Sequence, residues 1–548
     1  MNQPDLSPVL SRRDFVELGS LAAAATVLPT ALAQGTAPTP VAPKQDPFAL
    51  AEMTVMQLQD GMKSGRLTSR GITQVYLQRI AGLDRQEPTL RAVLETNPDA
   101  LQIAEQLDQE RRLGRVRGPM HGIPVIIKDN IDTHDRMQTT AGSLALEGNI
   151  ALRDAFLVER LRAAGAVILA KANLSEWANF RSSRSSSGWS GRGRQCKNPY
   201  VLDRNPSGSS SGSGVAVSAN YCAVAVGTET DGSIISPSNA NGIVGIKPTV
   251  GLVSRSGVIP IAHSQDTAGP MCRTVADAAA LLSAMTGVDP RDPATAESES
   301  RMAPDYTAFL EPNGLRGARI GVRPRAGTNP VIDALMEDAI RVLRDLGAEV
   351  VDPADFATAG QLGTNERDVL QYEFKADLNA YLATMPPNVK YRTLADLIAF
   401  NEANKEREMP YFGQETFIAS QARGPLTDQA YLDARAKCVE LTRAKGIDAT
   451  MDQHRLDAMM GPSGGPAGLV DLVTMGGGGG GGGSSQFPAV SGYPHITVPA
   501  GFHMGLPMGI SFYGRAWGEP VLIKFAYAFE QATKARKWPT FIPTIVLS

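Results

Sequence analysis

Residues 205–248 read NPSGSSSGSGVAVSANYCAVAVGTETDGSIISPSNANGIVGIKP and contain two Gly/Ser-rich turns from which the interpretation of this chain starts. A Ser/Gly-rich turn comes first, and small residues follow it as far as a short strand-like piece at 222–226. A second Gly/Ser turn, at 227–233, then opens what reads as another helix. Because glycine allows positive φ and a close approach of the backbone, two such turns in succession predict N–H groups aimed at a shared point.

The hydroxyls of this stretch indicate serine chemistry, and two positions compete for the nucleophile. Residues 208–212 match the G-x-S-x-G elbow of α/β-hydrolases, which needs a strand immediately before it. The preceding residues 198–206 read as a loop, because two prolines and several polar residues interrupt them. Ser233 has the better setting, since strand-like residues precede its turn and a helix N-terminus presents free N–H groups to a developing oxyanion.

A lysine at the end of an apolar run is the second chemical clue. Residues 124–127 read PVII and predict a buried strand, which would carry Lys128 into the interior. A desolvated lysine has a lowered pKa and can act as a base near neutral pH. The ordinary alternative is a solvated lysine at a strand end.

Three ordered blocks resemble the signature of the amidase signature family. They are GIPVIIKDN at 122–130, SGSSSG at 207–212 and GTETDGSII at 227–235. The likeness extends over nearly the whole chain after residue 48 and is closest to bacterial peptide amidases, which share the GTETDGSI turn.

Mapped position by position, the resemblance implies a catalytic triad of Ser233, Ser209 and Lys128. The 24 residues from Ser209 to Ser233 match the family's spacing. In the family the relay serine follows a cis peptide bond, the lysine is the base and the second serine attacks the carbonyl. The resemblance therefore implies acyl transfer to water through an acyl-serine.

The turn before the nucleophile supplies the expected oxyanion donors, which are the backbone N–H groups of Thr230, Asp231, Gly232 and Ser233. Asp231 departs from the family pattern, which has glycine at this position. Its carboxylate could accept hydrogen bonds from a carboxamide NH₂ and so favour primary amides. It could equally brace the turn, and the sequence leaves both alternatives open.

The alternation of helical and strand-like segments predicts an α/β sandwich with a largely parallel or mixed sheet. The resemblance narrows this to a three-layer α/β/α sandwich around a large mixed sheet, in an amidase domain at 48–548 whose signature core spans about 118–285. Residues 357–445 have an almost wholly helical pattern. They predict an inserted helical region that shapes substrate entry.

The N-terminal residues 1–33 resemble a twin-arginine export signal, with SRRDF at 11–15, an Ala-rich apolar run and an A-x-A site at 31–33. We expect cleavage after Ala33 and a periplasmic or secreted enzyme. Residues 34–47 are rich in Pro, Ala and Thr and read as a linker. The eight glycines at 476–483 predict a flexible segment, either a lid edge or a plain surface loop.

Composition narrows the possible partners. A net charge of −3 over 548 residues gives no reason to expect nucleic acid or an anionic membrane. The four cysteines are widely spaced, so buried free thiols are favoured over one disulfide. The six histidines form no H-E-x-x-H, and we expect no metal and no cofactor. A Ser–His–Asp triad using His263 or His121 is the formal alternative to the lysine.

The sequence therefore predicts a serine amidase that converts a carboxamide, specifically the C-terminal amide of a peptide, to a carboxylate and ammonia. One alternative is a general aliphatic or aryl amidase. Another is a protein like the A subunit of the tRNA-dependent amidotransferase, against which the export signal argues, since that partner and its tRNA are cytosolic. A third is a non-catalytic binding protein. The sequence leaves the oligomeric state open, and a monomer is compatible with it.

Overall fold

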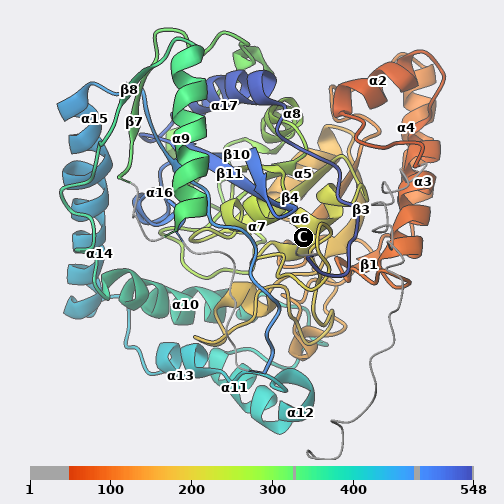
Figure 1. Ribbon diagram of the computed structural model, residues 1–548. Helices are drawn as coiled ribbons and strands as arrows, with labels where there is room; N and C mark the ends of the chain where they lie inside the picture. Colours follow the sequence, from red (N-terminus) through yellow and green to blue (C-terminus); the bar gives the residue numbers. More distant parts are fainter. Residues whose placement is uncertain (1–47, 325–328, 474–481, 546–548) are drawn as a thin grey trace, which may run out of the picture. The chain divides into compact units, whose positions relative to one another are not determined.

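The computed structural model describes residues 48–324, 329–473 and 482–545 (Figure 1). The expected export signal at 1–33, the linker at 34–47 and most of the glycine run at 476–483 lie outside the described residues. Those three expectations therefore stay predictions.

A mixed sheet of eleven strands forms the centre of the fold and confirms the predicted α/β class. The strands are β1 Val93–Thr96, β2 Pro124–Lys128, β3 Val167–Ala172, β4 Val224–Glu229, β5 Val244–Lys247, β6 Thr267–Cys272, β7 Arg319–Val322, β8 Glu349–Val351, β9 Ala458–Pro462, β10 His495–His503 and β11 Leu506–Tyr513. Their spatial order is β1-β3-β2-β4-β6-β5-β10-β11-β9-β7-β8.

Helices pack against this sheet and complete the sandwich (Figure 1). The helices are α2 Val55–Lys63, α3 Ser69–Leu83, α4 Ala100–Arg112, α5 Phe156–Ala163, α6 Ser211–Ser218, α7 Ile235–Ala240, α8 Val275–Met285, α9 Pro330–Asp345, α10 Asn365–Ala383, α11 Leu394–Ala403, α12 Lys405–Glu408, α13 Glu415–Gln421, α14 Gln429–Thr442, α15 Asp448–His454, α16 Gln486–Ser491 and α17 Glu519–Thr533.

The two central strands β2 and β4 run parallel to each other, and every residue in them is buried. Parallel strands covered on both faces favour continuous apolar runs, and both segments have one. Ile127 pairs with Val226, so Lys128 and the last residues of β4 reach the same edge of the sheet. The register thus brings the lysine block and the second Gly/Ser turn together.

The strand before the second Gly/Ser turn begins two residues later and ends three residues later than the predicted 222–226. It runs from Val224 to Glu229, because Gly227, Thr228 and Glu229 continue the antiparallel ladder with β6. The turn itself therefore begins at Thr230, and α7 begins at Ile235, two residues after Ser233. Glycine and threonine do not prevent strand pairing here, because β6 supplies the neighbouring ladder.

Helices α10 to α13 lie together at the lower side of the view in Figure 1, below the sheet. Phe374 and Leu378 of α10 belong to an apolar cluster of their own. This cluster also contains Trp177 and Ile259, from the loops that follow the central strands. The helical region thus packs over the loops at the end of the sheet where the chemistry is expected.

All four cysteines are buried and free, which agrees with the thiol state that the sequence favours. Among the residues that the structure describes, no helix combines the length and the apolar character needed to cross a membrane.

Candidate active site

Lys128 is fully buried at the end of β2, as its apolar run predicts. Its Nζ lies 2.7 Å from Oγ of Ser209 and 2.8 Å from Oγ1 of Thr228. The carbonyl oxygen of Thr228 is a third contact, at 3.3 Å. Thr228 comes from the end of β4, so the strand register described above creates this cluster.

The loop that carries Ser209 is fixed by backbone contacts. The peptide bond between Gly208 and Ser209 is cis, as the resemblance implies, and Ser209 accepts a hydrogen bond from the N–H of Ser175 at 3.0 Å. No strand precedes this loop, and α6 starts at Ser211, so the nucleophile-elbow reading is wrong. The elbow requires its serine on a strand-to-helix turn.

Ser210 connects this loop to the turn that carries Ser233. Its N–H donates to the carbonyl oxygen of Ser233 at 3.2 Å, and its hydroxyl donates to the carbonyl oxygen of Thr228 at 3.0 Å. The fold thus brings the loop of Ser209, the turn of Ser233 and Lys128 to one place. Both serines are buried, with Ser233 retaining 8% exposure.

The turn from Thr230 to Ser233 presents unused N–H groups. Within the described residues, the N–H groups of Asp231, Gly232 and Ser233 donate to no other protein group. Gly232 has φ +74°, a value that L side chains rarely adopt. Alternation of right- and left-handed residues forms a concave nest of N–H groups, which suits an oxyanion.

Two buried carboxylates hold this turn from either end. Glu229 accepts hydrogen bonds from the N–H groups of Ile234 at 2.7 Å and Ile235 at 3.0 Å. Asp266 accepts from the hydroxyl of Thr230 at 2.6 Å. The turn is therefore rigid before any substrate enters, which is what preorganised stabilisation requires.

Burial lowers the pKa of Lys128 to about 7, although the charges of Asp266 and Glu229 oppose the shift. The dominant cause is that an ammonium ion loses its hydration inside the protein. A lysine with this pKa is about half neutral at pH 7 and largely neutral by about pH 8. It can then accept a proton from the hydroxyl of Ser209.

A second carboxyl group, which sequence reasoning missed, stands beside Asp231. Glu366 is in the first turn of α10, and its Oε1 accepts from Nε2 of Gln265 at 3.4 Å. The same Nε2 of Gln265 contacts the carbonyl oxygen of Thr230 at 3.2 Å. An acidic residue in a first helical turn is ordinary, so no local pattern distinguishes Glu366.

Neither histidine of the alternative triad takes the position of a base next to a serine. Nδ1 of His263 lies 2.9 Å from Oδ2 of Asp377, and Nε2 lies 3.5 Å from Oε1 of Glu373. His121 Nε2 contacts the carbonyl oxygen of Leu107 at 3.0 Å. In the described part of the chain, the Ser–His–Asp alternative is therefore without a hydrogen-bonded Ser–His pair.

The cluster of His263, Glu373 and Asp377 is the one grouping among the described residues with the spacing of metal ligands, with one donor atom from each within 4.8 Å. Its oxygens already accept protein hydrogen bonds. Glu373 accepts from the N–H of Ser264 and the hydroxyl of Tyr431, and Asp377 accepts from the N–H of His263. We therefore interpret the cluster as a clasp between α10 and the 261–266 segment.

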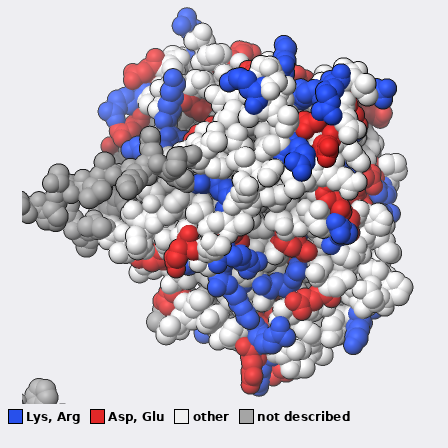
Figure 2. Space-filling model, turned by 90° about the vertical axis from the view of Figure 1, so that its right-hand side faces the viewer, with Lys and Arg blue, Asp and Glu red and all other residues white. Residues whose placement is uncertain are grey.

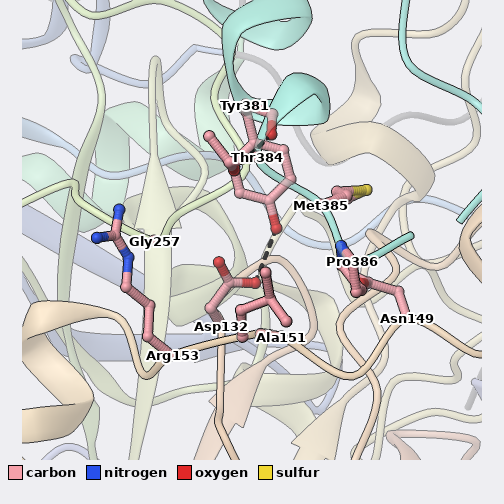
Figure 3. Close-up of a pocket in the computed structure, with 10 residues that line it drawn as sticks. Asp132, Asn149, Ala151, Arg153, Gly257, Tyr381, Thr384, Met385 and Pro386 are labelled. Carbon is pink, nitrogen blue, oxygen red and sulfur yellow. Dashed lines mark hydrogen bonds between the residues drawn. The ribbon is translucent and has the colours of Figure 1, made fainter. Parts of the chain in front are cut away.

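A separate pocket of about 440 Å³ lies where α10 ends, lined among others by Asp132, Arg153 and Tyr381. Figure 3 shows the Tyr381 hydroxyl pointing at Asp132, and this hydrogen bond is 2.7 Å long. Burial raises the pKa of Asp132 to about 6, although the hydrogen bond from Tyr381 opposes the shift. The contact ties the end of α10 to the loop that follows Lys128.

The surface adds no strong electrostatic feature on the face seen in Figure 2, where basic and acidic side chains are interspersed. Recognition is thus better sought in the buried turn than on this face.

Comparisons with known proteins agree with this geometry. The sequence profile of the family described as Amidase matches residues 71–523. The X-ray structure of native peptide amidase from Stenotrophomonas maltophilia is 52% identical, with a TM-score of 0.85, covering 90% of this chain and 99% of that chain. A structure of peptide amidase in complex with the competitive inhibitor chymostatin has a TM-score of 0.86 at 52% identity, covering 90% of this chain and 100% of that chain.

Two curated relatives extend the comparison. A probable amidase of Arabidopsis thaliana is 45% identical over 505 residues, which is 90% of this chain and 93% of that protein. The A subunit of glutamyl-tRNA(Gln) amidotransferase from Chloroflexus aurantiacus is 35% identical, covering 91% of this chain and 99% of that protein.

Proposed function

The chain belongs to the amidase signature family of hydrolases, and on that premise we propose that it hydrolyses the C-terminal carboxamide of peptides to a carboxylate and ammonia. Amidase activity follows from the family. The peptide substrate is proposed because the solved peptide amidase is 52% identical over 90% of this chain. A Ser233–Ser209–Lys128 relay is the proposed mechanism.

The reaction begins with proton transfer along this relay. Neutral Lys128 accepts the proton of Ser209, which takes the proton of Ser233 as the Ser233 oxygen attacks the amide carbon. The observation that supports this step most directly is the 2.7 Å contact between Lys128 Nζ and Ser209 Oγ. It is supported further by the pKa of about 7 that burial gives the lysine.

The C–N bond then breaks from a tetrahedral intermediate. Its oxyanion is stabilised by the N–H groups of the turn from Thr230 to Ser233, each worth about 3 kcal/mol of barrier in comparable sites. The relay returns the proton to the departing nitrogen, which leaves as ammonia. A water molecule, deprotonated by the same relay, attacks the acyl-serine and releases the carboxylate.

Ammonia release from a C-terminally amidated dipeptide and from a small aliphatic carboxamide tests the proposal, with the Ser233→Ala protein as blank. We expect a higher kcat/KM for the peptide amide. A preference for the small amide would retain the amidase but refute the peptide substrate. It would favour the general aliphatic or aryl amidase instead.

Glutamine hydrolysis for an amidotransferase is the second candidate, because the curated A subunit is 35% identical over 91% of this chain. The peptide amidase has the higher identity, 52%, over a similar share of the chain. Ammonia release from free glutamine, with the peptide amide beside it in the same assay, separates the two functions.

We also propose export through the twin-arginine route and a periplasmic or secreted location, on the strength of SRRDF at 11–15 and the A-x-A site at 31–33. N-terminal sequencing of the exported protein should start at Gln34. Replacing Arg12 and Arg13 by lysine should retain the protein in the cytoplasm. Exported protein that still begins at Met1 would contradict the cleavage.

A further inference from the structure

The carboxyl groups of Asp231 and Glu366 lie beside the turn at 230–233, and one carboxyl oxygen has no hydrogen-bond donor. Oδ1 of Asp231 is buried, and no N–H or O–H group of the described residues reaches it. Gln265 brings Glu366 to the same end of the turn, because its Nε2 contacts the carbonyl oxygen of Thr230 at 3.2 Å and Oε1 of Glu366 at 3.4 Å. Gln486 fixes Glu366 from the other side, through a bond of 2.9 Å to Oε2.

A buried acceptor without a donor is costly, and a proton between the two carboxyls removes this cost for both of them. Burial, followed by the charge of Asp231, raises the pKa of Glu366 to about 8. Burial also raises the pKa of Asp231. Two buried like charges side by side repel each other, so a single proton held between the two carboxyls is favoured near neutral pH.

Other charged groups face the pair but leave its negative charge in place. The positive charge of Lys247 opposes the rise in the pKa of Asp231 that burial causes. The same ammonium group also interacts with the carboxylates of Glu229 and Glu519, so its charge is not available to Asp231 alone. The thiol of Cys438, on α14, interacts with the charge of Glu366. Burial raises the pKa of this thiol to about 12, so the thiol stays protonated and adds no charge to the pair. The pair therefore presents about one negative charge to a site whose product is an anion.

We propose that Asp231 and Glu366 share one proton and form a monoanionic pair that admits an uncharged carboxamide and repels the carboxylate product. This inference rests on the proposed function, because a carboxylate arises here only if the site hydrolyses an amide. Asp231 is two residues before Ser233, so the product carboxylate forms within a few residues of the charge. Glu366 is a positioning residue that acts through Asp231.

Repulsion by the pair gives selectivity without a separate pocket. A carboxamide has no charge, and its N–H group can donate to the ionised oxygen of the pair. A free acid has a full negative charge and no donor at the same position, so it is disfavoured twice. The pair thereby lowers product inhibition and excludes peptides with an ordinary C-terminus.

Binding measurements on the Ser233→Ala protein test this without turnover. The probes are an N-acetylated dipeptide amide and the same dipeptide as the free acid, each titrated by calorimetry. A small aliphatic carboxamide and its acid form a second probe pair. If only the small pair binds, the peptide substrate of the proposed function fails, while the discrimination between amide and acid is still measured.

The effects of the two carboxyl substitutions on acid binding should not add, because the negative charge is lost only when both carboxyls are replaced. With one shared proton the pair has charge −1. Either Asp231→Asn or Glu366→Gln removes the neighbouring carboxylate charge that disfavours a second ionisation, so we expect the remaining carboxyl to ionise and the charge to stay at −1. Each single variant should therefore change acid binding at pH 7 by less than about threefold, whereas the double variant should bind the acid about tenfold more tightly. Asp368→Asn is the matched control on α10, since Asp368 is paired with Arg423 and should change neither probe.

The pH dependence supplies a second test that needs no carboxyl substitution. Acid binding to Ser233→Ala should weaken by about tenfold between pH 7 and pH 9 as the shared proton leaves. Lys247 titrates in the same range, with a pKa lowered by burial to about 8, and it remains in both single variants. The single variants have no shared proton, so any part of the pH-dependent weakening of acid binding that is absent from them is caused by the pair. Equal acid binding in the double variant and in Ser233→Ala, or an unchanged pH dependence in the single variants, would overturn the proposal.

Discussion

Lys128 Nζ lies 2.7 Å from Ser209 Oγ at a point where neither side chain is exposed to solvent. Its other partners, both from Thr228, are a hydroxyl and a carbonyl oxygen, and within the described residues it makes no ion pair. An ammonium ion in such a place has lost its water and gained no counter-charge in contact. The contact therefore favours a neutral amine, which is the form that can take a proton from serine.

The first prediction concerns the pH dependence of turnover. Because the pKa of Lys128 is lowered to about 7, kcat/KM for an uncharged amide should rise with pH and level off above that value. Below pH 7 the lysine is protonated and cannot act as the base. A pH–rate profile between pH 5.5 and 8, with circular dichroism at each pH to confirm folding, checks this. A flat profile would contradict the assignment of Lys128 as base.

The second prediction separates the two serines of the relay. Ser233→Ala should lower kcat by roughly 10⁴-fold or more and abolish labelling by an active-serine reagent. Ser209→Ala should lower kcat strongly while Ser233 is still present to be labelled slowly. Ser213→Ala is the matched control and should leave kcat nearly unchanged, because among the described residues its buried hydroxyl donates to the carbonyl oxygen of Val226 alone. Substantial turnover by Ser233→Ala would overturn the assignment.

Much of this site could be predicted because its parts are local in sequence. The apolar run before Lys128 indicates a buried strand, and the structure confirms it. The glycine at 232 indicates a turn with positive φ, which is also present. Hydrophobic pattern and glycine chemistry act over a few neighbouring residues, so a single sequence is sufficient to read them.

The supports of the site could not be predicted in the same way. Asp266 and Gln265 are more than thirty residues from the turn that they hold, and Glu366 is more than a hundred residues away. Only the packing of α10 over the end of the sheet brings Glu366 to Asp231. The ladder between β4 and β6 likewise extends a strand through Gly227, which propensity alone does not favour.

The third prediction concerns the clasp made by His263. The hydrogen bond to Asp377 is the main cause that raises the pKa of His263, and the charge of Glu373 adds to it. A raised histidine pKa contributes stability that is fully present below its unfolded value of 6.5 and is lost as pH rises through the folded value. His263→Gln should therefore lower Tm more at pH 5.5 than at pH 8.5.

Activity measurements on the same variant address the histidine alternative to the lysine base. Because His263 contacts α10 rather than a serine, kcat of His263→Gln should stay within about threefold, whereas loss of a triad member costs orders of magnitude. His503→Gln, at the end of β10, is the control for the pH dependence of Tm. An equal decrease in Tm at pH 5.5 and at pH 8.5 would show that the positive charge of His263 does not stabilise the clasp at low pH.

The fourth prediction is that replacing the Lys128 amine by an apolar group maintains or raises the stability of the fold while it destroys activity. The unfolded chain binds a proton on this lysine up to pH 10.5 and the folded chain only up to about 7, so stability rises with pH between these values. At pH 7 the shift opposes folding by roughly 4 kcal/mol, partly offset in a variant by the hydrogen bonds lost to Ser209 and Thr228. Lys128→Met should therefore unfold at equal or higher urea concentration than the wild type, with no turnover. Lys171→Met is the matched control on β3, because buried Lys171 lies 3.7 Å from Asp129 and donates to the carbonyl oxygen of Ile131 at 2.6 Å, so its removal takes a cation from a buried carboxylate and leaves a buried acceptor without its donor. It should be destabilised, and a comparable loss in Lys128→Met would contradict the neutral state of Lys128.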